Sequence, residues 1–241
     1  MESSPFLSRR RLVAVLGAVL AAVLGAAAVI AGPMIAGGRS PILAPLLAAN
    51  AEAGCSDIET IAIRGTTEPQ GGGIVAGPLA SALQNQLDES VQTHNLVYPA
   101  SFNYTASKRQ GVQALRDRLA RTSAACPDIS FVLIGYSQGA DVIGDTLQAG
   151  NVPAADRIDA VAMFGDPAFN SREDFVTGNF RPGTNGIFPR RTGALDEFAD
   201  EIVSFCNPDD TFCQRGASGA GHFRYGADRQ EAVDAVEALL G

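Results

Sequence analysis

Residues 131–149 read FVLIGYSQGADVIGDTLQA, an apolar strand that runs through Gly-x-Ser-x-Gly into an amphipathic helix. This is the context of a nucleophile elbow, in which a serine lies on a tight turn between a strand and a helix. Only glycine fits at Gly135 and Gly139 without a Cβ clash, and the turn forces Ser137 into a strained conformation with its hydroxyl exposed. The amino terminus of the helix would face the reacting oxygen as it becomes charged. The stretch therefore predicts a nucleophilic Ser137; the alternative is an ordinary strand-to-helix turn.

Strand-like and helical patterns alternate along the rest of the chain. We expect strands over residues 58–63, 96–98, 129–134, 158–164 and 201–205, and helices over 74–90, 104–122, the region after Ser137 and the final residues up to Leu240. In the last helix Val233, Val236 and Leu240 share one face, as expected for packing on a sheet. Such alternation predicts an α/β fold: a mostly parallel, five-stranded sheet with helices on both faces.

Residues 165–200 are the longest stretch without a clear element. They include large apolar side chains that a solvated linker would lack: Phe169, Phe175, Phe180, Ile187 and Phe188. We therefore expect a packed excursion near the ends of the strands. The sequence does not say whether this excursion covers the site around Ser137.

Length, composition and charge limit the class of protein. The chain has 241 residues, of which 46% are apolar, enough for one sizeable core but hardly for two full domains. Its formal net charge of −8 and pI of about 4.7 would repel a phosphate backbone, and the basic stripe of nucleic-acid-binding proteins is missing. We expect one α/β domain that acts as a monomer and does not bind nucleic acid.

The amino-terminal segment predicts export. Arginines at residues 9–11 precede an uncharged run from Leu12 to Gly38, long enough to cross a hydrocarbon layer about 30 Å thick. The small-residue sites at 26–28 and 49–51 are poorly placed for signal-peptide cleavage, so both a cleaved signal peptide and a retained membrane anchor stay open. Either would make the protein secreted or part of the cell envelope. We divide the chain into a signal or anchor segment (1–38), a tether (39–54) and a folded domain (55–241).

Four cysteines in an exported chain suggest two disulfide bonds, and three pairings are possible. The turn-rich residues between Cys206 and Cys213 could bring these two together, which would leave Cys55 with Cys126. Zinc binding is the alternative, but the chain has only two histidines and no Cys-x-x-Cys spacing. We therefore expect no metal site.

An activated serine needs a base, and the two histidines are His94 and His222. In α/β-hydrolases the chain order is serine, acid, histidine, which selects His222. His94, which precedes the strand expected at 96–98, is then a solvated or capping residue. His222 lies in the sequence GAGHFRYG at 219–226, where small residues let an imidazole reach a serine.

Three aspartates could orient this imidazole. Asp166 follows the strand expected at 158–164, in a Gly-Asp-Pro sequence that also starts turns for local reasons. Asp209 and Asp210 follow the last expected strand, where the acid of such hydrolases usually lies. A bridge between Cys206 and Cys213 would hold their loop in shape.

Four motifs together resemble the cutinase family of serine esterases. They are RGTTE at 64–68, GYSQG at 135–139, Cys206-Asn207-x-x-Asp210-x-x-Cys213, and His222-x-x-Tyr225-Gly226. The resemblance covers the folded part from Cys55 onward and implies a small, lidless α/β-hydrolase. It further implies Ser137 as nucleophile, His222 as base and Asp210 as acid, an oxyanion hole at Thr66 and Gln138, disulfides Cys55–Cys126 and Cys206–Cys213, and no metal or organic cofactor.

The resemblance implies an exported carboxylic-ester hydrolase that acts on an ester or lipid through an acyl-enzyme. One departure concerns residues 214–221, which carry fewer large apolar side chains than the lipid-binding rim of fungal cutinases. This argues against cutin as the natural substrate. Two alternatives remain: an acyltransferase that passes the acyl group to an alcohol, and a catalytically silent envelope protein that keeps the fold as a scaffold. The complete set of Ser137, Asp210 and His222 argues against the silent scaffold.

Overall fold

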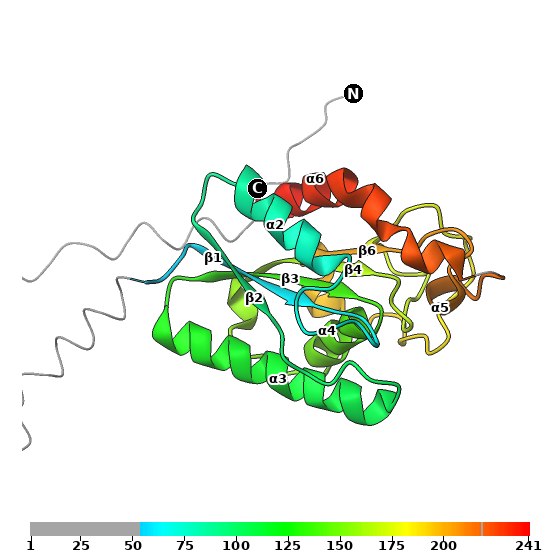
Figure 1. The fold of residues 1–241 in the computed structure, drawn as a ribbon, viewed down its shortest axis with the longest axis horizontal. Coiled ribbons are helices and arrows are strands. Elements are labelled where there is room, and N and C mark those ends of the chain that lie inside the picture. The colour runs from blue at the N-terminus through cyan, green and yellow to red at the C-terminus, as the bar shows by residue number, and fades with distance from the viewer. Residues whose placement is uncertain (1–53, 218) are drawn as a thin grey trace, which may run out of the picture. The chain divides into compact units, whose positions relative to one another are not determined.

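A computed structural model of the protein describes residues 54–217 and 219–241 (Figure 1). The strands are β1 (Ile58–Ile63), β2 (Val91–Asn95), β3 (Ser130–Tyr136), β4 (Ile158–Phe164), β5 (Val176–Thr177) and β6 (Ile202–Phe205). The α-helices are α2 (Ala76–Gln86), α3 (Tyr104–Ala125), α4 (Gln138–Gln148), α5 (Thr211–Gln214) and α6 (Arg229–Leu240). Short 3₁₀ helices lie at Ala155–Arg157, Asp196–Glu201, Ala220–Phe223 and Tyr225–Asp228.

The strands form one sheet in the order β2-β1-β3-β4-β6-β5, and every neighbouring pair is parallel. All residues of β1 are buried, and so are all residues of β3 after Ser130. Such continuous burial is typical of parallel strands that are covered on both faces. The predicted α/β class with a parallel sheet is confirmed.

Helices cover both faces of the sheet, as predicted (Figure 1). On one face, Leu115 of α3 and Val142 of α4 belong to a core layer that includes Leu133 of β3. On the other face, α2 and α6 form a second layer, in which Leu79 of α2 lies with Ile134 of β3. Neighbouring residues of β3 thus enter opposite layers, as the pleat of a strand requires.

The second strand lies earlier in the chain than we predicted. β2 covers Val91–Asn95 rather than 96–98, and His94 therefore lies within a strand, beside Ile61 in register. β2 is an edge strand in which only Val91 is buried, so its sequence lacks an apolar signal. The buried Leu96 and Tyr98, which suggested the strand, lie in the loop that follows it.

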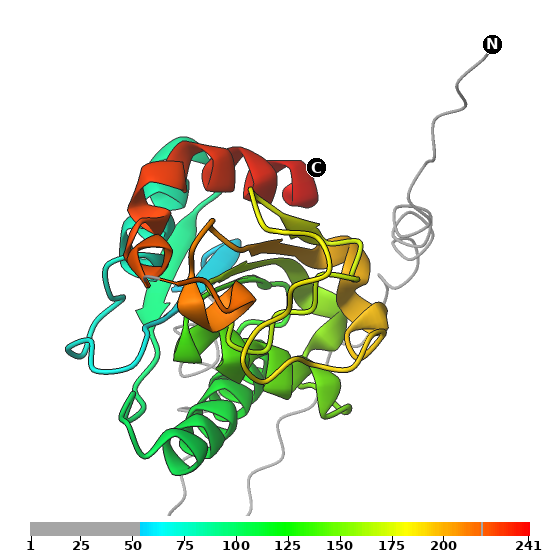
Figure 2. The ribbon, with the colours of Figure 1, turned by 90° about the vertical axis from the view of Figure 1, so that its right-hand side faces the viewer.

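Residues 165–200 form a packed excursion at the end of the sheet where β4 ends, as expected (Figure 2). The main chain of residues 186–190 donates to that of 167–169: Gly186 to Phe169, Phe188 to Pro167 and Arg190 to Ala168, each at 2.9 Å. The excursion also contains β5, which pairs with β6. The sheet therefore has six strands rather than the five we predicted.

The proposed signal or anchor segment, residues 1–38, lies outside the described residues, as does the tether up to residue 53. Among the residues that the structure describes, we find no helix of the length and hydropathy that crossing a membrane requires.

Candidate active site

Ser137 lies on the turn between β3 and α4, with φ of 53° and ψ of −119°. Non-glycine residues rarely adopt this conformation, which costs of order 1–3 kcal/mol. A Cβ at Gly135 would lie 2.7 Å from the backbone of Gly139 and Ala140, and a Cβ at Gly139 would overlap the carbonyl of Ile63. The strained turn and its need for both glycines agree with the sequence argument. Ser137 is less exposed than we expected, at 8%.

The side chain of His222 contacts Ser137 from a loop 85 residues further along the chain. Nε2 lies 3.0 Å from Oγ of Ser137, and Nδ1 lies 2.8 Å from Oδ2 of Asp210. All three residues are buried, and Asp210 completely so. They form one continuous series of hydrogen bonds.

The two carboxylate oxygens of Asp210 have separate partners. Oδ1 caps α5 by accepting the N–H groups of Phe212 at 2.7 Å and Cys213 at 3.2 Å. Oδ2 faces His222 and also accepts the hydroxyl of Tyr225 at 2.6 Å. Burial raises the pKa of Asp210, but His222, Tyr225 and the N–H of Phe212 together outweigh it, and the pKa lies below its ordinary value. The carboxylate is therefore ionised and fixed in orientation.

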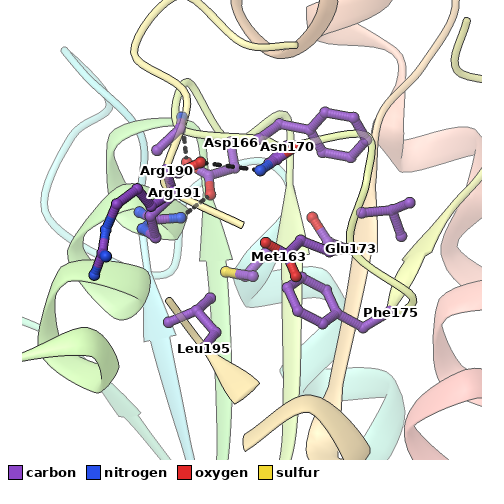
Figure 3. Close-up of a pocket in the computed structure, with 12 residues that line it drawn as sticks. Met163, Asp166, Asn170, Glu173, Phe175, Arg190, Arg191 and Leu195 are labelled. Carbon is purple, nitrogen blue, oxygen red and sulfur yellow. Dashed lines mark hydrogen bonds and ion pairs between the residues drawn. The ribbon is translucent and has the colours of Figure 1, made fainter. Parts of the chain in front are cut away.

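The other two aspartates that we considered have different surroundings. Asp209 is exposed. Asp166 is buried and forms an ion pair with Arg190 at 2.7 Å, beside a small cavity of about 10 Å³ (Figure 3). Arg190 also pairs with Asp141 of α4 at 2.9 Å. Asp166 thus belongs to a buried ion network that connects the excursion to α4.

Two disulfide bonds are present, Cys55–Cys126 and Cys206–Cys213, the pairs that the resemblance implies. Cys206 and Cys213 are fully buried, and their bond closes the loop that carries Asp210. The other bond joins the residues before β1 to the end of α3.

The two candidate oxyanion donors adjoin Ser137. Gln138 is the first residue of α4, so its N–H has no carbonyl partner within the helix. Its buried side chain accepts the hydroxyl of Ser107 at 2.7 Å. Thr66 follows Gly65, where a Cβ would lie only 3.2 Å from the Cβ of Ser137. The loop after β1 therefore packs directly against the serine.

Ser137 and His222 line a pocket of about 520 Å³. Its other lining residues are mostly apolar or aromatic: Thr66, Thr67, Glu68, Ile74, Phe102, Tyr104, Tyr136, Pro167, Ile187, Phe188, Phe212 and Phe223. The excursion forms one wall through Pro167, Ile187 and Phe188. Tyr104 of α3 contacts this wall, since its ring centroid lies 5.8 Å from that of Phe188.

Large apolar side chains surround this pocket although residues 214–221 lack them. Phe102 is 85% exposed, Phe223 69%, and Ile74 and Phe188 57% each. They come from four segments that are distant in sequence, so the local composition of 214–221 could not reveal them. The composition of residues 214–221 is therefore no evidence against cutin as a substrate, contrary to our expectation.

Sequence reasoning assigned no role to three residues that lie against the candidate acid and base. Tyr225 donates to Asp210, and Tyr136 donates to the main-chain carbonyl of His222 at 2.8 Å. Gly165 has φ of 58°, and a Cβ there would lie 2.9 Å from Nδ1 of His222. The tyrosines stand inside two of the quoted motifs, which was the available signal. Gly165 carries no signal beyond its place after a strand.

The sequence matches the cutinase family over residues 54–240. It is 32% identical to the carboxylesterase Culp1 of Mycobacterium tuberculosis over 217 residues, which cover 90% of this chain and 89% of that protein. It is also 32% identical to the phospholipase Culp4 of the same organism, covering 76% of this chain and 78% of that protein. The catalytic core of an acetyl xylan esterase from Trichoderma reesei superposes with a TM-score of 0.68 at 25% identity, covering 77% of this chain and all of that one.

The family match spans the whole described domain, and the parallel sheet, the two disulfides and the strained serine turn lie within it. The chain therefore belongs to the cutinase family and is a serine ester hydrolase.

Proposed function

We propose that the protein is an exported carboxylic-ester hydrolase in which Ser137, His222 and Asp210 form the catalytic triad. The observation that carries this proposal is the series of hydrogen bonds from Asp210 to His222 (2.8 Å) and from His222 to Ser137 (3.0 Å), which ends in the pocket. A base needs to be within reach of the nucleophile's proton and to be oriented by a third group. This arrangement meets both requirements.

The reaction follows from these positions. Nε2 of His222 takes the hydroxyl proton as Oγ of Ser137 bonds to the ester carbonyl carbon, and the π electrons move to the carbonyl oxygen. The N–H groups of Thr66 and Gln138 stabilise that oxyanion. The imidazolium then gives its proton to the alcohol oxygen as the C–O bond breaks, which leaves an acyl-enzyme. Water, deprotonated by His222, attacks the acyl carbon, and the acid leaves as Ser137 regains its proton. Asp210 stays ionised throughout and holds the imidazole tautomer.

The pocket supports a substrate with an apolar acyl chain. Ile187, Phe188 and Phe212 line it, and the exposed Phe102 and Phe223 extend the apolar surface outward. Each Å² of apolar surface that leaves water contributes about 25 cal/mol to binding. The relatives named as a carboxylesterase and a phospholipase are consistent with an ester or lipid substrate.

A panel of nitrophenyl esters from acetate to palmitate tests the proposal. Ser137→Ala should lower hydrolysis by several orders of magnitude at unchanged folding, because it removes one member of a catalytic unit. Ser81→Ala, an exposed serine of α2, is the matched control and should keep full activity. A fluorophosphonate should label the wild type and the control but not Ser137→Ala. Hydrolysis by Ser137→Ala at the wild-type rate would refute the assignment.

Product analysis with an added alcohol distinguishes hydrolysis from acyl transfer. If the free acid remains the main product, the enzyme is a hydrolase; if the new ester dominates, it is an acyltransferase with the same triad.

We further propose that residues 1–38 direct export and that 39–54 tether the domain 55–241 outside the cytoplasm. The two disulfide bonds support this, because such bonds persist mainly in oxidising compartments. Cell fractionation followed by amino-terminal sequencing is the test. A membrane-bound product would indicate an anchor, a soluble product that begins between Ala28 and Cys55 would indicate a removed signal peptide, and a cytoplasmic product would refute export.

A further inference from the structure

Glu68 connects the two ends of the loop between β1 and α2. Its Oε2 accepts the N–H of Gly65 at 2.5 Å, and its Oε1 accepts the N–H of Ile74 at 2.7 Å. The side chain is half-buried and lines the pocket. Within the part of the chain that the structure describes, this carboxylate forms no ion pair. Both of its oxygens therefore serve the main chain of this loop.

Glu68 holds both peptide units that flank Gly65, the Arg64–Gly65 peptide through its side chain and the Gly65–Thr66 peptide through its main chain. The N–H of Gly65 donates to the Glu68 side chain, and the carbonyl of Gly65 accepts the main-chain N–H of Glu68 at 3.3 Å. A trans peptide is planar, so its C=O and N–H point in opposite directions. Because the carbonyl of Gly65 faces Glu68, the N–H of Thr66 faces away from it. Among residues 54–217 and 219–241 this N–H has no acceptor.

The loop needs such support because its conformation is strained. Thr67 has φ of 66°, a left-handed conformation that costs a non-glycine residue about 1–2 kcal/mol. The N–H of Thr67 donates to the carbonyl of Ala100 at 2.7 Å, and the guanidinium of Arg64 donates to the carbonyl of Glu68 at 2.9 Å. These contacts hold the far side of the loop. On the side that adjoins Ser137, the Glu68 carboxylate holds the Arg64–Gly65 peptide, and the long main-chain bond from Glu68 holds the Gly65 carbonyl.

We infer that Glu68 is a positioning residue of the oxyanion hole: its carboxylate fixes the Arg64–Gly65 peptide and thereby the turn in which the N–H of Thr66 faces the ester carbonyl oxygen bound at Ser137. The inference rests on the proposed function, because it needs an oxyanion to form there. Preorganised donors accelerate such reactions because they need no reorientation when the charge develops. Without the carboxylate, the N–H of Gly65 loses its acceptor and only the 3.3 Å main-chain bond holds the Gly65–Thr66 peptide, which can then rotate so that the N–H of Thr66 leaves the hole.

The test compares Glu68→Ala and Glu68→Gln with Glu89→Ala, an exposed glutamate just before β2. Loss of one oxyanion donor costs about 10²–10³ in kcat, so Glu68→Ala should lower kcat about 10²-fold with little change in KM. Glu68→Gln keeps one acceptor oxygen and should lose less. Glu89→Ala removes the same charge and should retain the wild-type kcat.

An inhibitor pair separates oxyanion stabilisation from general damage. A trifluoromethyl ketone adds to the serine hydroxyl and forms a tetrahedral oxyanion, whereas the matching methyl ketone binds without this addition. In the Glu68 variants the Ki of the trifluoromethyl ketone should rise by the same factor by which kcat/KM falls, and the Ki of the methyl ketone should not change. Thermal unfolding of both variants should stay close to that of the wild type.

Wild-type kcat in Glu68→Ala, or an equal loss of affinity for both ketones, would overturn the inference. The inference would also be overturned if Glu68→Gln lost kcat together with a matching fall in its melting temperature, because general destabilisation would then explain the loss. If Ser137→Ala is inactive while Glu68→Ala is fully active, the positioning role fails and the proposed function survives. If Ser137→Ala remains active, the proposed function itself fails.

Discussion

Gly165 lies against the hydrogen bond between His222 and Asp210. Gly165→Ala should therefore lower kcat in protein that is still folded. A Cβ at this position would lie 2.9 Å from Nδ1 of His222 and 3.0 Å from Oδ2 of Asp210. Ordinary contact begins at 3.4 Å, so these atoms have to move by about 0.5 Å. The two hydrogen bonds of His222, 2.8 and 3.0 Å long, would then reach the weak end of the normal range.

Gly150→Ala is the matched control for Gly165→Ala. Gly165 has φ of 58° and Gly150 has φ of 70°, but a Cβ at Gly150 would meet no atom within 4 Å. Alanine in this region of φ costs about 1–2 kcal/mol in both variants. The crowding of His222, Tyr225 and Asp210 adds about 1–3 kcal/mol in Gly165→Ala alone. A misplacement of about 1 Å can cost about 10²-fold in rate. Half that displacement predicts that kcat falls about tenfold or more in Gly165→Ala and does not change in Gly150→Ala.

Steady-state kinetics on nitrophenyl butyrate and urea unfolding of both variants measure the two effects separately. If Gly165→Ala keeps the wild-type kcat, or if both alanine variants lose activity equally, the reasoning from the Cβ contacts is wrong. A loss of kcat in Gly165→Ala alone, while both variants are still folded under the assay conditions, supports it.

Three further predictions concern the acid, the buried ion network of Arg190 and the short disulfide loop. Asp210→Asn should lower kcat about 10⁴-fold because an amide cannot hold the imidazole tautomer, whereas Asp209→Asn should change it much less; the reverse order would contradict the assignment. Arg190→Met leaves the buried Asp166 without its cation, whereas Asp141 keeps Lys108 at 3.1 Å, and should cost about 3–5 kcal/mol at pH 7 by urea unfolding. Burial and the nearby Asp166 raise the pKa of Asp141 to about 6, and the loss of Arg190 raises it further, so the cost should shrink at pH 5 as Asp141 takes up a proton; an equal loss at both pH values would count against this. Reduction of Cys206–Cys213 should abolish activity before the core unfolds, since so short a loop contributes only about 2.5 kcal/mol; simultaneous loss of activity and near-ultraviolet circular dichroism would disprove it.

The sequence predicted the strands that helices cover on both faces of the sheet. β1 and β4 have their expected bounds because each is a short, mainly apolar segment. β2 was misplaced because an edge strand with one buried residue has little apolar pattern. β5 was missed because its two residues form a strand only by pairing with β6, which lies 25 or more residues later in the chain. A local sequence pattern indicates which residues are buried, but it does not indicate which distant strand a segment pairs with.

The candidate site shows the same division. Residue types and their order in the chain sufficed to choose Ser137 and His222, which the structure brings within hydrogen-bond distance. They did not separate Asp209 from Asp210, because neighbours in sequence share the same local signals. Only the fold turns one carboxylate inward, where it caps α5, and leaves the other exposed. The apolar lining of the pocket could not be predicted from local sequence either, because its phenylalanines come from segments that are distant in the chain.

The three proposed catalytic side chains are not positioned independently. Strand, turn and helix hold Ser137, and the disulfide loop holds Asp210, which caps its own short helix. His222 lies in a loop and depends on tertiary contacts. Tyr136, next to Ser137, donates to the carbonyl of His222, and the centroids of these two rings lie 5.0 Å apart. The ring centroid of Phe212, two residues after Asp210, lies 4.4 Å from that of the imidazole. The segments that present the nucleophile and the acid therefore also hold the base, so a disturbance of either one should reach all three.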